Sequence, residues 1–292
     1  MRETSGLHEA LLTRLGASVS ELVDSVRRSV VVLRGSHGSV GSGVVWRSDG
    51  TVVTNAHVVR GGVISVELPG GEHVVGDVVR VAPERDLAVV RVREAVLTPA
   101  RVGDAARLRP GEVVLALGTP LGVPGAATLG VVSGVSPAWR LPDGRRSEAI
   151  IAHVALRPGN SGGPLLDARG GVVGVNTLAM GPKTGVAIPS HVAEALLDGP
   201  TLGVSGRLVG LASPWQERFG AATGILVDAV APGSLADRAG MRRGDVLVAV
   251  DGEAATGVVD LARLLARRAG RVVELTVLRE SGLRSLEVLV PA

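Results

Sequence analysis

The stretch Gly159-Asn160-Ser161-Gly162-Gly163-Pro164 places a serine on a glycine-flanked turn between two apolar runs. Because Gly159 has no Cβ, the backbone can come close to a reacting carbonyl group at this point. Backbone N–H groups in such a turn can face one point and hold an oxyanion, so we predict an oxyanion hole at Gly159, Asn160 and Ser161. Ser161 is then a candidate nucleophile, provided that a base and an orienting acid lie elsewhere in the chain.

A histidine and an aspartate upstream can supply these two partners. His57 lies in Thr54-Asn55-Ala56-His57-Val58-Val59, and Asp86 opens the run Asp86-Leu87-Ala88-Val89-Val90. Taken alone, the three residues also fit a tight turn, a half-buried histidine and a strand-end acid. Their order along the chain is that of the chymotrypsin arrangement, and it differs from the order in subtilisins and α/β-hydrolases. We therefore predict a triad in which Ser161 attacks, His57 moves the proton and Asp86 orients the imidazole.

These segments also carry a resemblance to a known family. Together with Gly41-Ser42-Gly43-Val44-Val45, residues 117–122 and residues 185–189, they make residues 29–197 resemble a trypsin-like serine protease. More narrowly, the chain resembles the HtrA family of PDZ-containing proteases. The resemblance implies two six-stranded β-barrels with the triad in the cleft between them. It also implies an ATP-independent serine endopeptidase that degrades unfolded or damaged polypeptides in protein quality control.

The residues before the nucleophile bear on substrate preference. In trypsin-like folds the residue six positions before the serine helps to set the preference for the P1 side chain, and here it is Ala155, followed by Leu156. The other wall of the S1 pocket is expected from Val186 and Ala187. Since none of these residues is acidic, we predict an apolar pocket for Val, Ala or Leu rather than for Lys or Arg.

Residues 203–292 resemble a PDZ domain of the HtrA type. The resemblance rests on Val230-Ala231-Pro232-Gly233-Ser234-Leu235-Ala236, Arg243-Gly244-Asp245-Val246-Leu247 and Val250-Asp251-Gly252. Such domains bind peptide C-termini by adding a strand to a sheet edge, and loop N–H groups hold the terminal carboxylate. The expected carboxylate loop includes Leu202, Gly203 and Val204. The groove wall is expected from Val258, Leu261 and Leu265, for which core packing is the alternative explanation.

The remaining pattern predicts the domain organisation. Short valine-rich runs broken by Gly, Pro, Asp and Asn favour a barrel or sandwich over residues 29–197. Apolar residues at helical spacing predict an amphipathic helix within the extension 1–28, which either packs on the protease body or forms an oligomer contact. The resemblance implies a homotrimer as the possible oligomer. Residues 198–202 form a Gly- and Pro-containing linker, so the fold class is mainly β with an α+β PDZ domain at 203–292.

Composition limits the partners of the chain. Hydrophobic residues make up 46% of the 292 residues but aromatic residues only 1%, so Val, Leu, Ile and Ala must build the core. The net charge is +3. The isoelectric point of about 10.6 arises because Lys183 is the sole lysine and almost every other basic residue is an arginine, which titrates only at very high pH. The sequence lacks the combination of aromatic and basic residues on which nucleic-acid bases stack, so we expect no nucleic-acid partner.

Other sequence signals are missing. The chain has no cysteine, and it contains neither a phosphate-cradling loop nor a metal-ligand cluster, so we expect no cofactor and no metal. No stretch approaches the ~20 apolar residues of a membrane span. The first residues lack a basic flank followed by an apolar core, so we expect no signal peptide, no membrane anchor and a cytoplasmic location.

Two alternatives to a general degradative protease remain open. In the first, the protein is a peptide-binding chaperone or scaffold whose oxyanion hole is not formed. In the second, it is a processing protease that cleaves one site in a folded substrate. Labelling of Ser161 by a fluorophosphonate distinguishes an active enzyme from a chaperone or scaffold. The number of cleaved sites distinguishes a degradative protease from a processing protease.

Overall fold

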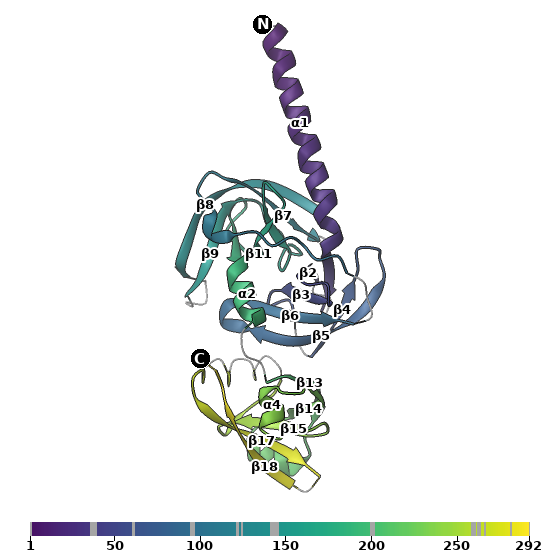
Figure 1. The fold of residues 1–292 in the computed structure, drawn as a ribbon, viewed down its shortest axis with the longest axis vertical. Helices are drawn as coiled ribbons and strands as arrows, with labels where there is room; N and C mark the ends of the chain where they lie inside the picture. The colour runs from purple at the N-terminus through teal and green to yellow at the C-terminus, as the bar shows by residue number, and fades with distance from the viewer. Residues whose placement is uncertain are drawn as a thin grey trace.

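A computed structural model shows a helix, two β-barrels and a separate C-terminal sheet along the chain (Figure 1). It describes residues 2–35, 40–59, 62–93, 97–120, 123, 125–140, 146–198, 202–257, 261, 264–265, 267–280 and 282–291. This architecture confirms the predicted fold class, which is mainly β with an N-terminal helix and an α+β domain at the end.

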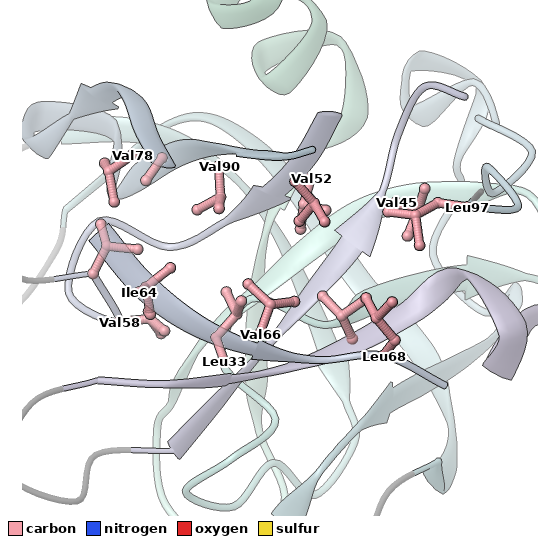
Figure 2. Close-up of a cluster of buried hydrophobic side chains, with 14 of the residues drawn as sticks. Leu33, Val45, Val52, Val58, Ile64, Val66, Leu68, Val78, Val90 and Leu97 are labelled. Carbon is pink, nitrogen blue, oxygen red and sulfur yellow. The ribbon is translucent and has the colours of Figure 1, made fainter. Parts of the chain in front are cut away.

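In the described residues, six antiparallel strands close the first barrel in the order β1-β2-β3-β6-β5-β4. The strands are β1 Val30–Arg34, β2 Val40–Val45, β3 Thr51–Thr54, β4 Val63–Glu67, β5 His73–Ala82 and β6 Leu87–Val92. The barrel is filled almost entirely by aliphatic side chains, among them Leu33, Val52 and Val90, which are fully buried (Figure 2). Because β-branched side chains pack well on a pleated surface, the valine-rich runs form strands without needing aromatic residues.

The second barrel is closed in the order β10-β11-β12-β9-β8-β7, again within the described ranges. The strands are β7 Val113–Gly118, β8 Ala126–Arg140, β9 Arg146–His153, β10 Pro164–Asp167, β11 Val172–Ala179 and β12 Gly185–Pro189. Its interior contains Ile150, Leu165 and Ala187. Short 3₁₀ turns occur at η1 Arg27–Ser29, η3 Pro83–Arg85 and η4 Ala105–Arg107.

A third buried cluster joins the two barrels. It contains Val44 and Val53 from the first barrel together with Leu117 and Val175 from the second. Helix α2, Ser190–Asp198, adds Val192 to the same cluster. The barrels are therefore held against each other by apolar packing, and the loops at their junction are brought together.

Helix α1, Arg2–Val26, packs on this joining cluster only through its last turns. Val19, Leu22 and Val23 are partly buried there, and Val26 is buried. The earlier turns extend away from the barrels in Figure 1, and Leu15 is 50% exposed. Packing on the two barrels thus accounts for the C-terminal part of the helix, while an oligomer contact stays a prediction for the rest. No helix in the described ranges has the length and apolar character needed to cross a bilayer.

The C-terminal domain contains one twisted sheet in the order β13-β14-β15-β17-β18, with β16 paired to β15. Its elements are β13 Val204–Gly210, α3 Ser213–Phe219, β14 Thr223–Val230, α4 Leu235–Arg238, β15 Val246–Val250, β16 Glu253–Ala254, β17 Val272–Arg279 and β18 Gly282–Leu289. Ile225, Leu247 and Leu275 lie in its buried core. The Ser234 hydroxyl accepts a hydrogen bond from the Asp237 N–H and caps α4, as expected of a serine at that position.

Asp245 is the most deeply buried charged side chain described in this domain, at 1% exposure. Its two oxygens accept hydrogen bonds from Arg279 Nε at 2.6 Å and Arg279 Nη2 at 2.7 Å, and the Arg242 N–H donates at 2.8 Å. Burial would raise the pKa of Asp245, but the hydrogen bonds from Arg279 and Arg242 outweigh it and hold the pKa below the ordinary value of an aspartate. The bidentate pair ties β17 to the turn before β15.

We expect Asp245→Asn to destabilise the C-terminal domain by about 3 kcal/mol, because Arg279 then loses its buried partner. The depressed pKa implies that this stabilisation is full above the unfolded-state pKa of about 4 and is lost as the pH falls through the lower folded pKa. Urea denaturation at pH 7 and pH 3, followed by hydrogen exchange of the amides in β15 and β17, measures both effects. The control is Asp228→Asn, whose partner Arg207 is 63% exposed and which should cost under ~0.5 kcal/mol. Equal losses in the two variants would contradict the account.

Candidate functional site

The first barrel brings residues 57 and 86 to the same end of two neighbouring strands. β3 and β6 are antiparallel, and Thr54 lies opposite Ala88. The chain therefore leaves β3 just beyond Thr54 at the place where it enters β6, so His57 and Asp86 are placed side by side. Asp86 itself adopts a left-handed conformation with φ of 53°, which turns the chain from η3 into β6.

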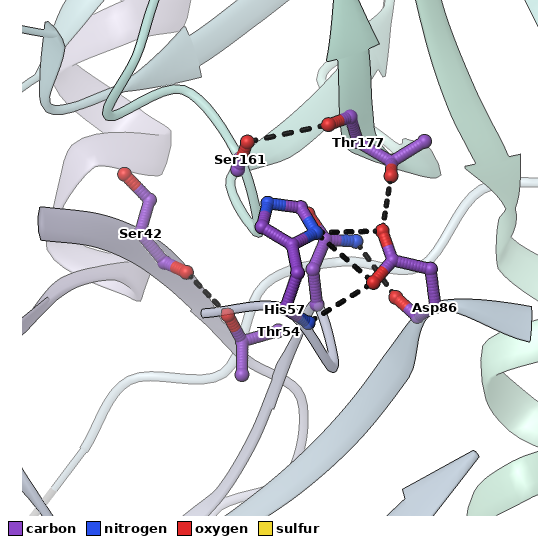
Figure 3. Close-up of polar contacts among 7 residues, drawn as sticks. Ser42, Thr54, His57, Asp86, Ser161 and Thr177 are labelled. Atoms are coloured by element: carbon purple, nitrogen blue, oxygen red, sulfur yellow. Dashed lines mark hydrogen bonds and ion pairs between the residues drawn. The ribbon is translucent and has the colours of Figure 1, made fainter. Parts of the chain in front are cut away.

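The Asp86 carboxylate holds both the ring and the backbone of His57 (Figure 3). His57 Nδ1 lies 2.8 Å from Asp86 Oδ2 and 3.0 Å from Oδ1, and the His57 N–H donates to Oδ1 at 3.1 Å. Since a carboxylate only accepts, the imidazole proton sits on Nδ1, and Nε2 is left as an acceptor. The Asp86 side chain is 15% exposed and the His57 side chain 50% exposed, so the imidazole is open to a reacting molecule.

Thr177 on β11 connects this pair to Ser161. Its hydroxyl donates to Asp86 Oδ2, and its carbonyl oxygen accepts from Ser161 Oγ at 3.2 Å. The sequence alone does not identify Thr177. The only signal was a polar pair, Asn176-Thr177, at the end of the apolar run 172–175. Nothing in that spacing indicates that the Thr177 side chain contacts Asp86 of the other barrel.

The Ser161 hydroxyl is directed at Thr177 rather than at the histidine. Among the described residues no hydrogen bond joins Ser161 to His57, although Figure 3 places the imidazole between the Asp86 carboxylate and the Ser161 side chain. A rotation about χ1 would change the partner of the hydroxyl without moving the backbone. Nucleophile–base hydrogen bonds often tighten only in the complex with substrate.

A type II turn shapes the backbone before Ser161. The Asn160 N–H donates to the Arg157 carbonyl at 2.9 Å, and Gly159, in the third position of this turn, has φ of +102°. A closed four-residue turn with proline second and positive φ at the third residue is type II, which requires glycine there. A Cβ on Gly159 would also collide with the Thr119 carbonyl oxygen.

Two backbone donors at or next to this turn have no acceptor among the described residues. Within the described residues, the N–H groups of Gly159 and Ser161 donate no hydrogen bond, whereas those of Asn160, Gly162 and Gly163 do. Free N–H groups on residues 159 and 161 are the arrangement that can hold a developing oxyanion.

Asn160 differs from what the sequence predicts. The sequence pattern predicts Asn160 as part of the oxyanion hole, but its N–H closes the turn onto the Arg157 carbonyl. Its side-chain Oδ1 accepts from the Arg157 N–H at 3.1 Å, and the residue is 3% exposed. Asn160 therefore braces the turn and does not present a donor to an oxyanion.

The predicted S1 residues do not all face the same space. Leu156 is half-buried and packs against the cluster that contains Ala187, and a Cβ on Gly185 would lie 2.8 Å from Leu156 Cγ. Ala155 is also half-buried. Val186 is 1% exposed and lies next to Ala187 on β12, so its side chain points to the opposite face of the strand. Val186 and Ala187 therefore cannot form one wall together.

The predicted carboxylate loop of the C-terminal domain has the expected backbone conformation. Gly203 has φ of +75°, and a Cβ there would collide with Ser234. The carbonyls of Leu202 and Gly203 accept from Ala236 and Ala231, both at 2.8 Å. In the described part of the chain, the N–H groups of Leu202 and Gly203 donate to no acceptor. The loop is thus fixed by its carbonyls while two N–H groups stay available.

The predicted groove residues have different positions. Leu261 is 7% exposed and belongs to the buried core, so the alternative explanation of core packing holds for it. Leu265 is partly buried against that core. Val258 lies outside the described residues. In the described ranges, no group of three His, Asp or Glu side chains could hold a metal ion.

Comparisons with known proteins agree with this geometry. A family model described as a trypsin-like peptidase domain matches residues 41–175, and a PDZ domain model matches residues 226–279. The protein named as the serine protease HhoA of Synechocystis sp. is 38% identical over 85% of this chain and 69% of its own length. Solved structures of the HtrA-type protease AlgW match as well. The one with a decapeptide has a TM-score of 0.56 and 26% identity and covers 93% of this chain and 98% of its own.

The two matched domains place the chain among the trypsin-like serine proteases with a PDZ domain. Within that class, the chain belongs to the HtrA family.

The expected cytoplasmic location is wrong. Proteins named as periplasmic serine endoproteases, DegP-like, include one from Marinomonas sp. that is 33% identical over 89% of this chain. Similar names belong to relatives from Halomonas elongata and Chlamydia trachomatis. The expectation rested on the first residues of the sequence, and a location cannot be derived from them. The chain spans 56% of the length of a second serine protease from Synechocystis sp., named HhoB, and 58% of the length of the Marinomonas relative.

Proposed function

We propose that this chain is an ATP-independent serine endopeptidase that degrades unfolded or damaged proteins. The observation that carries the proposal is the hydrogen-bonded set His57–Asp86–Thr177–Ser161 at the junction of two barrels. It stands beside the N–H groups of Gly159 and of Ser161 itself, which have no acceptor among the described residues. A nucleophile, a base, an orienting acid and oxyanion donors are the parts that acyl transfer needs.

In this proposal the Ser161 hydroxyl rotates from Thr177 to His57 Nε2 and attacks the scissile carbonyl. His57 takes the hydroxyl proton and later gives it to the leaving amine, while Asp86 stabilises the imidazolium through Nδ1. Thr177 limits the movement of the carboxylate, since its hydroxyl occupies Asp86 Oδ2. Water then hydrolyses the acyl-enzyme by the same proton path in reverse.

The oxyanion of the tetrahedral intermediate accepts hydrogen bonds from the N–H groups of Gly159 and Ser161. Each donor of this kind contributes about 10²–10³-fold in rate. The type II turn already carries Gly159 in its left-handed conformation. This supports an active enzyme over the chaperone alternative, in which the hole is not formed.

The C-terminal domain engages peptide C-termini. The terminal carboxylate accepts from the N–H groups of Leu202 and Gly203, and the peptide extends along β13 as an added strand. Leu265 contributes to the wall beside it. The AlgW structures, which are named as complexes with a decapeptide and a tripeptide, support peptides as the ligand class.

We expect a fluorophosphonate to label wild-type protein once, at Ser161, and to leave Ser161→Ala unlabelled. Ser161→Ala should lose about 10⁶-fold in kcat on unfolded casein, yet keep its melting temperature, because a reacting hydroxyl is removed and no packing atom. The matched control is Ser190→Ala. Ser190 is another buried serine of the same domain, 1% exposed, and this variant should be labelled to the same extent as the wild type.

Binding of unfolded casein by a wild-type protein that no fluorophosphonate labels would contradict the proposal and support the chaperone alternative. Cleavage of a single site in a folded substrate, with none in unfolded casein, would support the processing alternative instead.

We expect an apolar P1 preference, because the predicted S1 residues Ala155 and Leu156 are uncharged and half-buried, whereas Ala187 lies inside the second barrel. In a peptide library, cleavage should follow Val, Ala or Leu, because an unpaired Arg or Lys would be desolvated there without an acid. Leu156→Ala enlarges the pocket and should shift the preference toward larger apolar side chains. Efficient cleavage after Arg with none after Val would refute this specificity.

A further inference from the structure

Ser42 is a buried polar residue that neither the triad nor the oxyanion donors include. It lies on β2 of the first barrel, opposite Val32 of β1, and is 0% exposed. A buried hydroxyl is costly unless it is hydrogen-bonded, so its partners indicate what it is for. Those partners lie in the second barrel.

Ser42 holds two carbonyl groups of the nucleophile turn. Its Oγ donates to the Gly159 carbonyl oxygen at 2.7 Å, and its N–H donates to the Ser161 carbonyl oxygen at 2.8 Å. Gly159 and Ser161 are also the two residues of this segment whose own N–H groups have no acceptor among the described residues. A single residue of one barrel thus holds the carbonyl groups of the two residues on either side of Asn160 in the other barrel.

The Thr119 hydroxyl lies next to the Ser42 hydroxyl at this contact between the barrels. Ser42 Oγ lies 3.4 Å from Thr119 Oγ1, and the Thr119 N–H donates to the Gly159 carbonyl at 3.1 Å. A hydroxyl has one proton, and the shorter contact to Gly159 takes it, so Thr119 Oγ1 donates to Ser42 Oγ. The Gly159 carbonyl therefore accepts one hydrogen bond from each barrel.

Ser42 has little freedom to move. Thr54 Oγ1 donates to the Ser42 carbonyl at 2.7 Å. That carbonyl packs so closely on Gly162 that a Cβ there would collide with it. The hydroxyl of Ser42 is consequently held in place by the barrel and does not merely follow the turn.

We propose that Ser42 is a positioning residue that aligns the Gly159 and Ser161 N–H groups for the oxyanion, acting from the opposite barrel through the Gly159 carbonyl. The proposal rests on the proposed protease function. Without the Ser42 hydroxyl, the Gly159 carbonyl keeps only the hydrogen bond from the Thr119 N–H, while the Asn160 N–H stays on the Arg157 carbonyl. The Gly159 and Ser161 N–H groups are then less well aligned with the substrate oxygen. Because that oxygen becomes charged only in the transition state, kcat falls while substrate binding is unchanged.

The test is steady-state hydrolysis of an apolar-P1 peptide ester by full-length Ser42→Ala. We expect kcat to fall about tenfold, short of the loss of a whole donor, with KM changed less than about twofold. A peptide boronate, which forms a tetrahedral adduct, should lose affinity in parallel with kcat/KM. Should Ser42→Ala fail to fold, Ser42→Cys keeps a similar shape with a weaker donor and is expected to show the same split.

Ser190→Ala is the matched control, because Ser190 Oγ also donates to a carbonyl, that of Gly103, at 2.9 Å. It should leave kcat, KM and boronate affinity unchanged. An unchanged kcat in Ser42→Ala, a change in KM alone, or equal losses in both serine variants would overturn the proposal. A wild type that neither hydrolyses the ester nor reacts with fluorophosphonate would overturn the protease function itself.

Discussion

Leu117 of the second barrel and Val44 and Val53 of the first lie in one buried cluster, and each of these side chains is fully buried. Each barrel closes on itself, so neither needs the other to satisfy its backbone hydrogen bonds. What unites them is this apolar layer together with a few polar contacts at its rim. Because the reacting groups come from both barrels, the packing of the layer determines their separation.

Glycine allows the backbone at this junction to come close enough for the polar contacts. Side chains at Gly159 and Gly162 would collide with the carbonyls of Thr119 and Ser42, and one at Gly163 with that of Leu117. Each of those carbonyls belongs to a strand or turn that the apolar layer holds in place. These carbonyl groups limit the conformation of the turn before the nucleophile. The apolar packing that stabilises the fold therefore also sets the geometry of the reacting groups.

The sequence predicted the parts of the site that lie in compact motifs, and it missed those that depend on tertiary contacts. His57, Asp86 and Ser161 each lie in a recognisable local pattern, and their order along the chain indicated the arrangement. Thr177 and the hydroxyl of Ser42 act on partners 91 and 117 residues away, which no local pattern encodes. Asn160 was wrongly placed in the oxyanion hole, because residue spacing does not reveal which N–H groups are hydrogen-bonded within a turn. Val186 was wrongly placed in one wall with Ala187, because neighbouring residues of a strand point to opposite faces.

We propose that the type II turn before Ser161 already has its working conformation and that the two barrels hold it there. A crystal structure of the adduct between Ser161 and a peptide boronate tests this most directly. The account predicts a boronate oxygen about 3 Å from the N–H nitrogens of both Gly159 and Ser161, with φ of Gly159 still positive and Ser42 Oγ still on the Gly159 carbonyl. A turn that changes to negative φ at Gly159 on forming the adduct, or boron bonded to another residue, would contradict it.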